Sequence, residues 1–155
     1  MNWTINFPPI ENHSKELYPN ATELYITADG GGSNGSRNRL WKYCLQEFSY
    51  ESGLTIPASH FPPGTSKWNK IEHRLLNHIS MNWKGQPLVS LDVIINLIGS
   101  TTSQKGLKVY AMEDRNVYPT KRKIPDKEMV KINIVQNDSL GKGNYTIKPK
   151  VIPNV

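Results

Sequence analysis

Hydrophobic residues divide the first third of the chain into a short strand pattern and a helical pattern. Residues 24–28 form a short apolar, β-prone run that stops at Asp29 and a glycine-rich segment, residues 30–35. In residues 37–51 the apolar positions recur at i, i+3, i+4 and i+7, which predicts an amphipathic helix. Gly53 follows at the place where a helix commonly ends.

The pattern continues with a second strand and two more helices. Residues 54–61 are β-prone, and residues 67–83 show helical spacing. A third helix is predicted from Ser90, as N-cap, to Gly99. Beyond it the pattern weakens into a charged, turn-rich, irregular C-terminal tail, in which residues 107–111 and 144–147 are candidates for short strands.

The order strand, helix, strand, helix indicates the α/β class. A strand–helix–strand unit of this length is almost always a right-handed crossover between parallel strands. Pro57 lies within the second predicted strand, and proline cannot donate a hydrogen bond to a neighbouring strand. We therefore expect residues 54–61 to form an edge strand.

Composition narrows the class of protein further. The chain has 155 residues, of which 37% are hydrophobic, enough for one domain with a modest core. Its net charge of +6 favours a polyanionic partner such as nucleic acid. The single cysteine excludes a disulfide within the chain. No signal peptide and no apolar run of membrane-spanning length is visible, so the expectation is a cytoplasmic protein without a membrane partner.

Two acidic residues stand out by position. Asp29 follows the first strand, and open α/β sheets bind ligands at the carboxyl ends of their strands; alternatively, Asp29 only opens a turn. Glu72 shares a helix face with Leu75, Leu76 and Ile79, where a carboxylate is costly unless paired, protonated or metal-bound. Alternatively, Glu72 reaches solvent from the first helical turn.

We expect the two carboxylates to lie within roughly 8 Å of each other if they share a pair of divalent metal ions. Basic residues open both helices near them and are candidates for contacts with DNA phosphates. Trp68, four residues before Glu72, is a candidate either for walling the site or for contacting an unpaired base. The candidate DNA-binding residues are Arg37, Arg39, Lys42, Lys67, Trp68, Lys70 and Arg74.

Two segments resemble a known family. Residues 24–40, LYITADGGGSNGSRNRL, and residues 60–73, HFPPGTSKWNKIEH, resemble the signature blocks of ISAzo13-type transposases. These belong to the wider ribonuclease H-like DDE superfamily. The resemblance covers roughly residues 15–149, leaving residues 1–14 as a non-family segment and residues 150–155 as a tail.

The resemblance implies a ribonuclease H-like fold with sheet order 3-2-1-4-5. Residues 24–29 would belong to its strand 4 and residues 54–61 to its strand 5, an edge strand in that order. By the same implication Asp29 is the second and Glu72 the last acid of the catalytic triad. Mg²⁺ or Mn²⁺ would be the cofactor and DNA the substrate.

The first acid of the triad has no counterpart. No Asp precedes Asp29 in the chain, and strands 1 to 3 of the family fold are also missing. The sequence therefore indicates an N-terminally truncated transposase that is inactive alone. The alternatives are a non-catalytic remnant that binds nucleic acid or an intact transposase, and a basic nucleic-acid-binding module that reuses half of the fold.

Overall fold

The computed structural model describes residues 16–117 and 122–149, which divide into two compact units. The first unit takes residues 16–66 and 122–149 of the described chain, and the second takes residues 67–117. The predicted segments 1–14 and 150–155 lie outside the described residues. No helix in the described ranges is long and apolar enough to cross a membrane.

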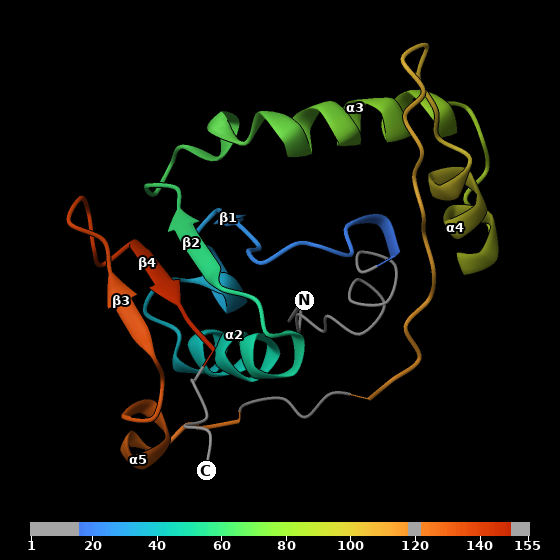
Figure 1. Cartoon of the computed structure of the whole chain (residues 1–155). Helices are drawn as coiled ribbons and strands as arrows, with labels where there is room; N and C mark the ends of the chain where they lie inside the picture. The colour runs from blue at the N-terminus through green and yellow to red at the C-terminus, as the bar shows by residue number, and fades with distance from the viewer. Residues whose placement is uncertain (1–15, 118–121, 150–155) are drawn as a thin grey trace. The chain divides into compact units, whose positions relative to one another are not determined.

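The first unit contains a mixed sheet of four strands, which confirms the α/β class (Figure 1). In sheet order the strands are β1 (Ile26–Ala28), β2 (Ile56–His60), β4 (Asn144–Ile147) and β3 (Ile134–Gln136). As predicted, β1 and β2 are parallel and are joined through helix α2 (Arg39–Ser52). The last two strands form an antiparallel hairpin, and β4 pairs antiparallel with β2.

The prediction that residues 54–61 form an edge strand is wrong. Strand β2 is paired on both sides, and Pro57 lies opposite Thr146 of β4. The N–H groups of Thr55 and Phe61 donate to the β1 side, so the missing N–H of Pro57 is on that side too. Its absence leaves a gap between the isolated Glu23–Thr55 bridge and β1, whereas pairing with β4 is unaffected.

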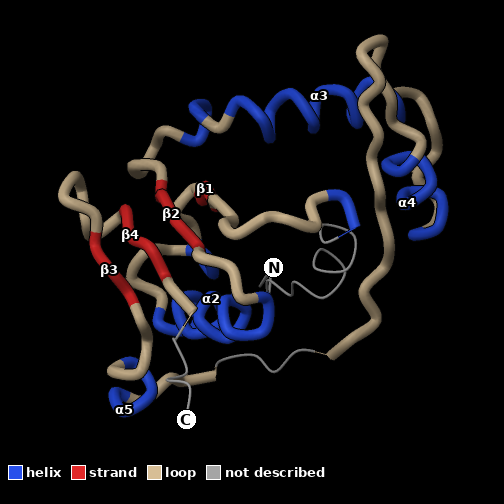
Figure 2. The backbone as a smooth tube through the Cα atoms, in the orientation of Figure 1, coloured by secondary structure: helices blue, strands red, loops and turns tan. Residues whose placement is uncertain are grey.

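Helix α2 covers one face of this sheet and supplies much of the core (Figure 2). Its predicted apolar stripe is confirmed: Trp41, Leu45 and Phe48 are buried. Asn38 caps the helix, and Gly53 ends it in the left-handed conformation that favours glycine. The stripe packs against core residues from three strands, namely Ala28, Ile56, Ala58, Tyr145 and Ile147.

The C-terminal part is not an irregular tail. It contains α5 (Asp126–Met129) and the hairpin β3–β4, so the candidate strand at residues 144–147 is confirmed. The buried amide of Gln46 holds this part to α2: Gln46 Nε2 donates to the carbonyl of Lys148, and Gln46 Oε1 accepts from the N–H of Asn133. Helix and hairpin therefore share one hydrogen-bonded core.

The second unit is a pair of helices and the extended chain that follows. The short 3-10 helix η2 (Ser66–Trp68) leads into α3 (Lys70–Trp83), and α4 (Leu91–Gly99) follows. Ser90 caps α4, as predicted. Asn82 Nδ2 donates to the carbonyl of Leu97, which joins the C-terminal ends of the two helices.

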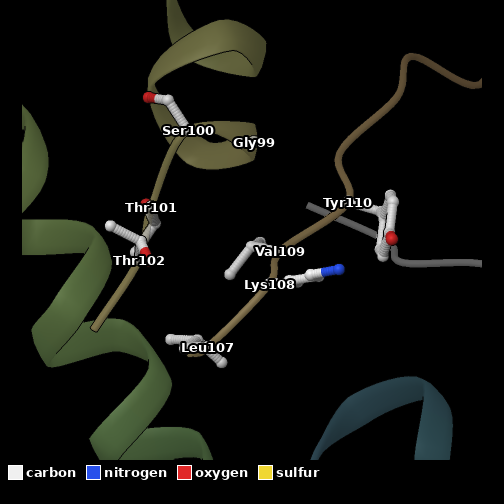
Figure 3. A pocket seen from close by; sticks show the side chains of 8 residues that line it. All are labelled: Gly99, Ser100, Thr101, Thr102, Leu107, Lys108, Val109 and Tyr110. Carbon is white, nitrogen blue, oxygen red and sulfur yellow. The ribbon is translucent and has the colours of Figure 1, made fainter. Parts of the chain in front are cut away.

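No strand forms at residues 107–111, contrary to the prediction. Residues 99–102 and 107–110 instead line a hollow of ≈ 300 Å³ (Figure 3). Its lining is hydroxyl groups, backbone and short apolar side chains, with one cation, Lys108. No carboxylate or histidine lines it, so we assign it no catalytic role.

The fold predicts that the C-terminal hairpin contributes to the stability of the first unit. Ile147 on β4 is fully buried, so Ile147→Ala should lower the free energy of unfolding by about 2–5 kcal/mol. Val135→Ala on β3 is the matched control, because Val135 is 46% exposed and its loss should cost no more than about 0.5 kcal/mol. Urea denaturation measures both. Equal effects of the two substitutions would show that the hairpin does not complete the core.

Candidate active site

Asp29 lies where β1 ends, at the carboxyl end of a parallel strand. The carbonyl of Ala28 still accepts a hydrogen bond from the N–H of Phe61, at 2.8 Å. The chain then turns away at Gly30, whose positive φ of 74° is unfavourable for a residue with a side chain. A Cβ at Gly30 would also lie 3.4 Å from the carbonyl oxygen of Phe61. The local sequence therefore presents Asp29 at the edge of the sheet.

A hydrogen bond orients the exposed carboxylate of Asp29: the N–H of Gly31 donates to Asp29 Oδ1 at 3.0 Å. This bond foremost, and then the nearby side chain of Asn34, holds the pKa of Asp29 below its usual value. Asp29 is thus an ionised carboxylate at neutral pH. Gly31 is the N-cap of the 3-10 helix η1 (Gly32–Asn34), and Asn34 is its last residue.

The segment that holds Asp29 also starts helix α2. Asn38 Oδ1 accepts from the N–H groups of Leu40 and Trp41, while Asn38 Nδ2 donates to the carbonyl of Ser33. One asparagine therefore caps the helix and fixes the glycine-rich segment to it. This places the first turn of α2 next to the segment that orients Asp29.

His60 lies at the same edge of the sheet, because it is the register partner of Ala28 in the parallel ladder. Its Nε2 lies 3.0 Å from the hydroxyl of Tyr145, which also accepts a hydrogen bond from Trp41 Nε1 at 2.8 Å. Burial, with the nearby charge of Lys42, lowers the pKa of His60, and the charge of Asp29 opposes this shift. Burial also raises the pKa of Tyr145 to about 12. Both rings are therefore neutral at pH 7.

Glu72 lies in the first turn of α3. The N-cap residue Asn69 donates from its Nδ2 to Glu72 Oε2 at 2.6 Å, and Asn69 Oδ1 accepts from the N–H of Glu72 at 3.4 Å. This reciprocal pair is close to a capping box. Of the predicted inward stripe only Ile79 is buried, and Glu72 is exposed. Its position therefore fits the alternative interpretation as well, a carboxylate stabilised at a helix N-terminus.

Asp29 and Glu72 belong to different units, whose relative positions are not determined. The expected approach of the two carboxylates stays a prediction.

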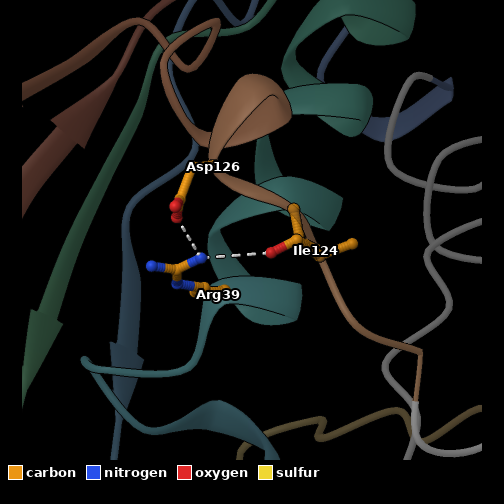
Figure 4. A network of polar contacts seen from close by, with 3 residues as sticks. All are labelled: Arg39, Ile124 and Asp126. Atoms are coloured by element: carbon orange, nitrogen blue, oxygen red, sulfur yellow. Dashed lines mark hydrogen bonds and ion pairs between the residues drawn. The ribbon is translucent and has the colours of Figure 1, made fainter.

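Arg39 has a contact that the sequence did not suggest. Its Nη1 donates to Asp126 Oδ1 at 2.6 Å and to the carbonyl of Ile124 at 3.2 Å (Figure 4). It therefore joins the start of α2 to the chain entering α5. The guanidinium remains half-exposed and retains other N–H groups, so its contact with DNA stays a prediction.

The other candidate DNA-binding residues divide between the units. Arg37 is exposed in the first unit, and Lys42 is half-buried, with its Nζ 5.1 Å from the centre of the Tyr145 ring. In the second unit all the candidates are exposed around the N-terminus of α3: Lys67, Trp68, Lys70 and Arg74.

The donor set fits part of a divalent metal site. Within the described residues no group of three or more His, Cys, Asp or Glu side chains could hold a metal ion. Asp29 nevertheless has the right chemistry for one ligand, because its carboxylate is exposed, oriented and ionised, and Mg²⁺ often takes only one or two protein carboxylates. Asp29 is thus the residue of the first unit that could hold such an ion, and a shared ion with Glu72 stays a prediction.

Sequence reasoning missed His60 and Tyr145. His60 could have been found, because the predicted parallel pairing already implied that the ends of the two strands meet at one edge. Tyr145 could not, because its place depends on the pairing of β4 with β2.

Asp29 lies at the carboxyl end of a parallel strand of an α/β domain, and open α/β sheets bind their ligands at that end of the strands. Residues 10–149 match the profile of the family described as "Rhodopirellula transposase DDE domain". The match covers most of the chain, which therefore belongs to this family of DDE transposases, as the two signature blocks suggested. No curated protein and no solved structure matched the chain.

We predict that Asn34, after Gly31, helps to hold the pKa of Asp29 down. Asn34→Ala should raise this pKa towards its usual value of 3.8, as measured by NMR titration of the carboxylate carbon. Because the folded-state pKa is the lower one, the associated stability is present above pH 3.8 and is lost as the pH falls through the folded-state pKa. Asn77→Ala, on exposed α3 surface, is the control. An unchanged Asp29 titration in Asn34→Ala would show that Asn34 does not stabilise the ionised carboxylate.

Proposed function

We propose that this chain supplies the second and the last acidic residue, Asp29 and Glu72, of a DNA-cleaving and strand-transferring transposase site. The observation that carries the proposal is the ionised, hydrogen-bonded Asp29 carboxylate at the end of β1, in a chain that belongs to the DDE transposase family. Its position after a strand parallel to β2 is the position at which α/β sheets bind ligands.

In this proposal the chain's residues hold the metal and the DNA. Mg²⁺ or Mn²⁺, when bound, would polarise the phosphodiester and lower the pKa of the attacking water or 3′-hydroxyl. Asp29 contributes a carboxylate that Gly31 orients and that Gly31 and Asn34 keep ionised. Glu72 contributes a second carboxylate from the start of α3, where Asn69 limits its rotation.

The positive net charge of the chain supports DNA as the substrate. The net charge is +6, and basic side chains are exposed at the start of α3 and just before α2. Contacts between these cations and phosphates would be strong at low salt and independent of base sequence. The exposed indole of Trp68 is suited to stacking on an unpaired base. DNA as substrate implies action at the nucleoid, in the cytoplasm.

The parallel pair β1–β2 supports a ribonuclease H-like arrangement in which these strands are strands 4 and 5. Within the described residues β1 has no second neighbour, so one of its sides offers unpaired backbone groups to a further strand. Strand 1 of the family fold, which carries the first Asp, would occupy that side. The free side of β1 is the observation that favours pairing with a further family segment, supplied by this or another chain.

A second candidate function follows from the same gap. No Asp precedes Asp29 among the 155 residues, so without a first acid these residues would bind DNA or an intact transposase without catalysis. The two candidate functions therefore differ in one requirement: the catalytic one needs a first acid from a further segment, and the non-catalytic one does not.

The test is a cleavage and strand-transfer assay with Mg²⁺ or Mn²⁺ on DNA that carries the element ends. Residues 1–155 alone should give no product, because metal ions held by two carboxylates would be misplaced, and an error of about 1 Å already costs on the order of 100-fold in rate. A version extended by the family's strands 1 to 3 should be active. Within it, Asp29→Asn and Glu72→Gln should each abolish product formation.

The control in this assay is Asp92→Asn, an exposed acid in the first turn of α4, which should leave the rate unchanged. Product formation by residues 1–155 alone would contradict the claim that they lack a complete catalytic site. An extended version that tolerates Asp29→Asn or Glu72→Gln would overturn the site.

A further inference from the structure

Four side chains from three distant segments meet at the end of the core that lies beside Asp29. Trp41 and Lys42 come from the first turn of α2, His60 ends β2, and Tyr145 lies on β4. The His60 ring is 6.2 Å from that of Trp41 and 5.5 Å from that of Tyr145, measured between ring centres. Tyr145 is at the centre of the group and only 1% exposed.

The hydrogen bonds of the Tyr145 hydroxyl determine the state of His60. Trp41 Nε1 can only donate, so the Tyr145 oxygen accepts from it at 2.8 Å. The hydroxyl hydrogen is then free to point to His60 Nε2, at 3.0 Å. This arrangement satisfies the most groups, and it assigns the proton of neutral His60 to Nδ1. That nitrogen is buried and has no hydrogen-bond partner among the described residues.

The face of the Tyr145 ring holds a cation. Lys42 Nζ lies 5.1 Å from the ring centre, within the range of a cation–π contact. Burial lowers the pKa of Lys42, and no described carboxylate forms an ion pair with it within 4.0 Å. A partly desolvated ammonium without an anionic partner is unfavourable by itself, and an anionic ligand would stabilise it. Its place is one turn from Asn38, which is bonded to the segment that orients Asp29.

We propose that Lys42 is a phosphate anchor of the DNA site and that Tyr145 is its positioning residue. The face of the Tyr145 ring contacts the ammonium of Lys42. The Tyr145 hydroxyl forms hydrogen bonds with Trp41 and His60 and so keeps both rings in place around the Tyr145 ring. The phosphate belongs to the DNA strand that is held next to Asp29, so this inference rests on the proposed function. It gives the C-terminal hairpin an indirect part in substrate binding, through Lys42, although the hairpin lies more than 60 residues in sequence from both acidic residues.

Lys42 therefore differs from the exposed cations around it. Arg39 already uses one nitrogen for Asp126 and Ile124. Arg37 is exposed and has no hydrogen bond or ion pair within the described residues of the first unit, so it loses more side-chain entropy when it binds. The ammonium of Lys42 is already held against the Tyr145 ring and loses less side-chain entropy on binding. Its contact with a phosphate is therefore more favourable than that of Arg37.

The test uses the whole chain and a fluorescein-labelled DNA duplex titrated at several salt concentrations. Lys42→Ala should weaken binding about tenfold at 0.1 M salt and lower the slope of log affinity against log salt by about 0.9, one phosphate contact. Tyr145→Leu, which removes the ring, should weaken binding similarly. The double variant should bind no more weakly than Lys42→Ala, because Tyr145 acts through Lys42. Arg37→Ala is the control, and its effect should add to that of Lys42→Ala.

A second readout does not depend on DNA. In wild-type protein the imidazole ¹⁵N shifts of His60 should show a protonated Nδ1. Tyr145→Phe, which keeps the ring but loses the hydroxyl, should move them towards the Nε2-protonated tautomer. Tyr25→Phe, whose hydroxyl bonds Ser59 instead, should leave them unchanged. This measurement decides the role of the hydroxyl even if Tyr145→Leu fails to fold.

The outcomes separate the two claims. If wild type binds DNA but Lys42→Ala leaves the slope unchanged, or if the two losses add, the phosphate anchor is refuted and the proposed function stands. An Nε2-protonated His60 in wild type refutes the positioning by the hydroxyl. If wild type binds no DNA at any salt concentration, the proposed function and the anchor both fail.

Discussion

Pairing of β2 on both sides is the constraint on which the rest of the first unit depends. Its parallel register with β1 brings the end of β2 to Asp29, through the pair Ala28 and His60. Its antiparallel register with β4 brings Tyr145 under the same edge. Helix α2 can seal this sheet only because both registers place apolar side chains on one face. Loss of either pairing would separate residues that the site needs together.

The sequence predicted the local features well, since each depends on nearby residues. The stripe of α2, its end at Gly53 and the cap at Ser90 follow from spacing and hydrogen-bonding chemistry within a few positions. The place of β2 in the sheet could not be predicted in this way. Its second neighbour is far along the chain, and Pro57 argued against it. That argument failed because a proline interrupts pairing on one side only.

The parts of the candidate site likewise divide into local features, which the sequence predicted, and contacts between distant residues, which it did not. The position of Asp29 follows from a strand ending at a glycine-rich turn, which a local pattern reveals. The capping of Glu72 by Asn69 is equally local, although the predicted burial of Glu72 was not found. Arg39 binding Asp126, and Tyr145 holding Lys42, join residues more than 80 positions apart. Such contacts depend on the tertiary fold and have no signature in a single sequence.

The central claim, that Asp29 and Glu72 bind metal together, is tested most directly by replacing Mg²⁺ with Fe²⁺ in the DNA-bound chain. Ascorbate and peroxide then produce hydroxyl radicals at the ion, and these radicals cut the polypeptide backbone close to it. The account predicts cuts next to both residue 29 and residue 72, suppressed by excess Mg²⁺ and both lost in Asp29→Asn. Cuts at only one of the two segments, or cuts near Glu72 that persist in Asp29→Asn, would contradict a shared metal site.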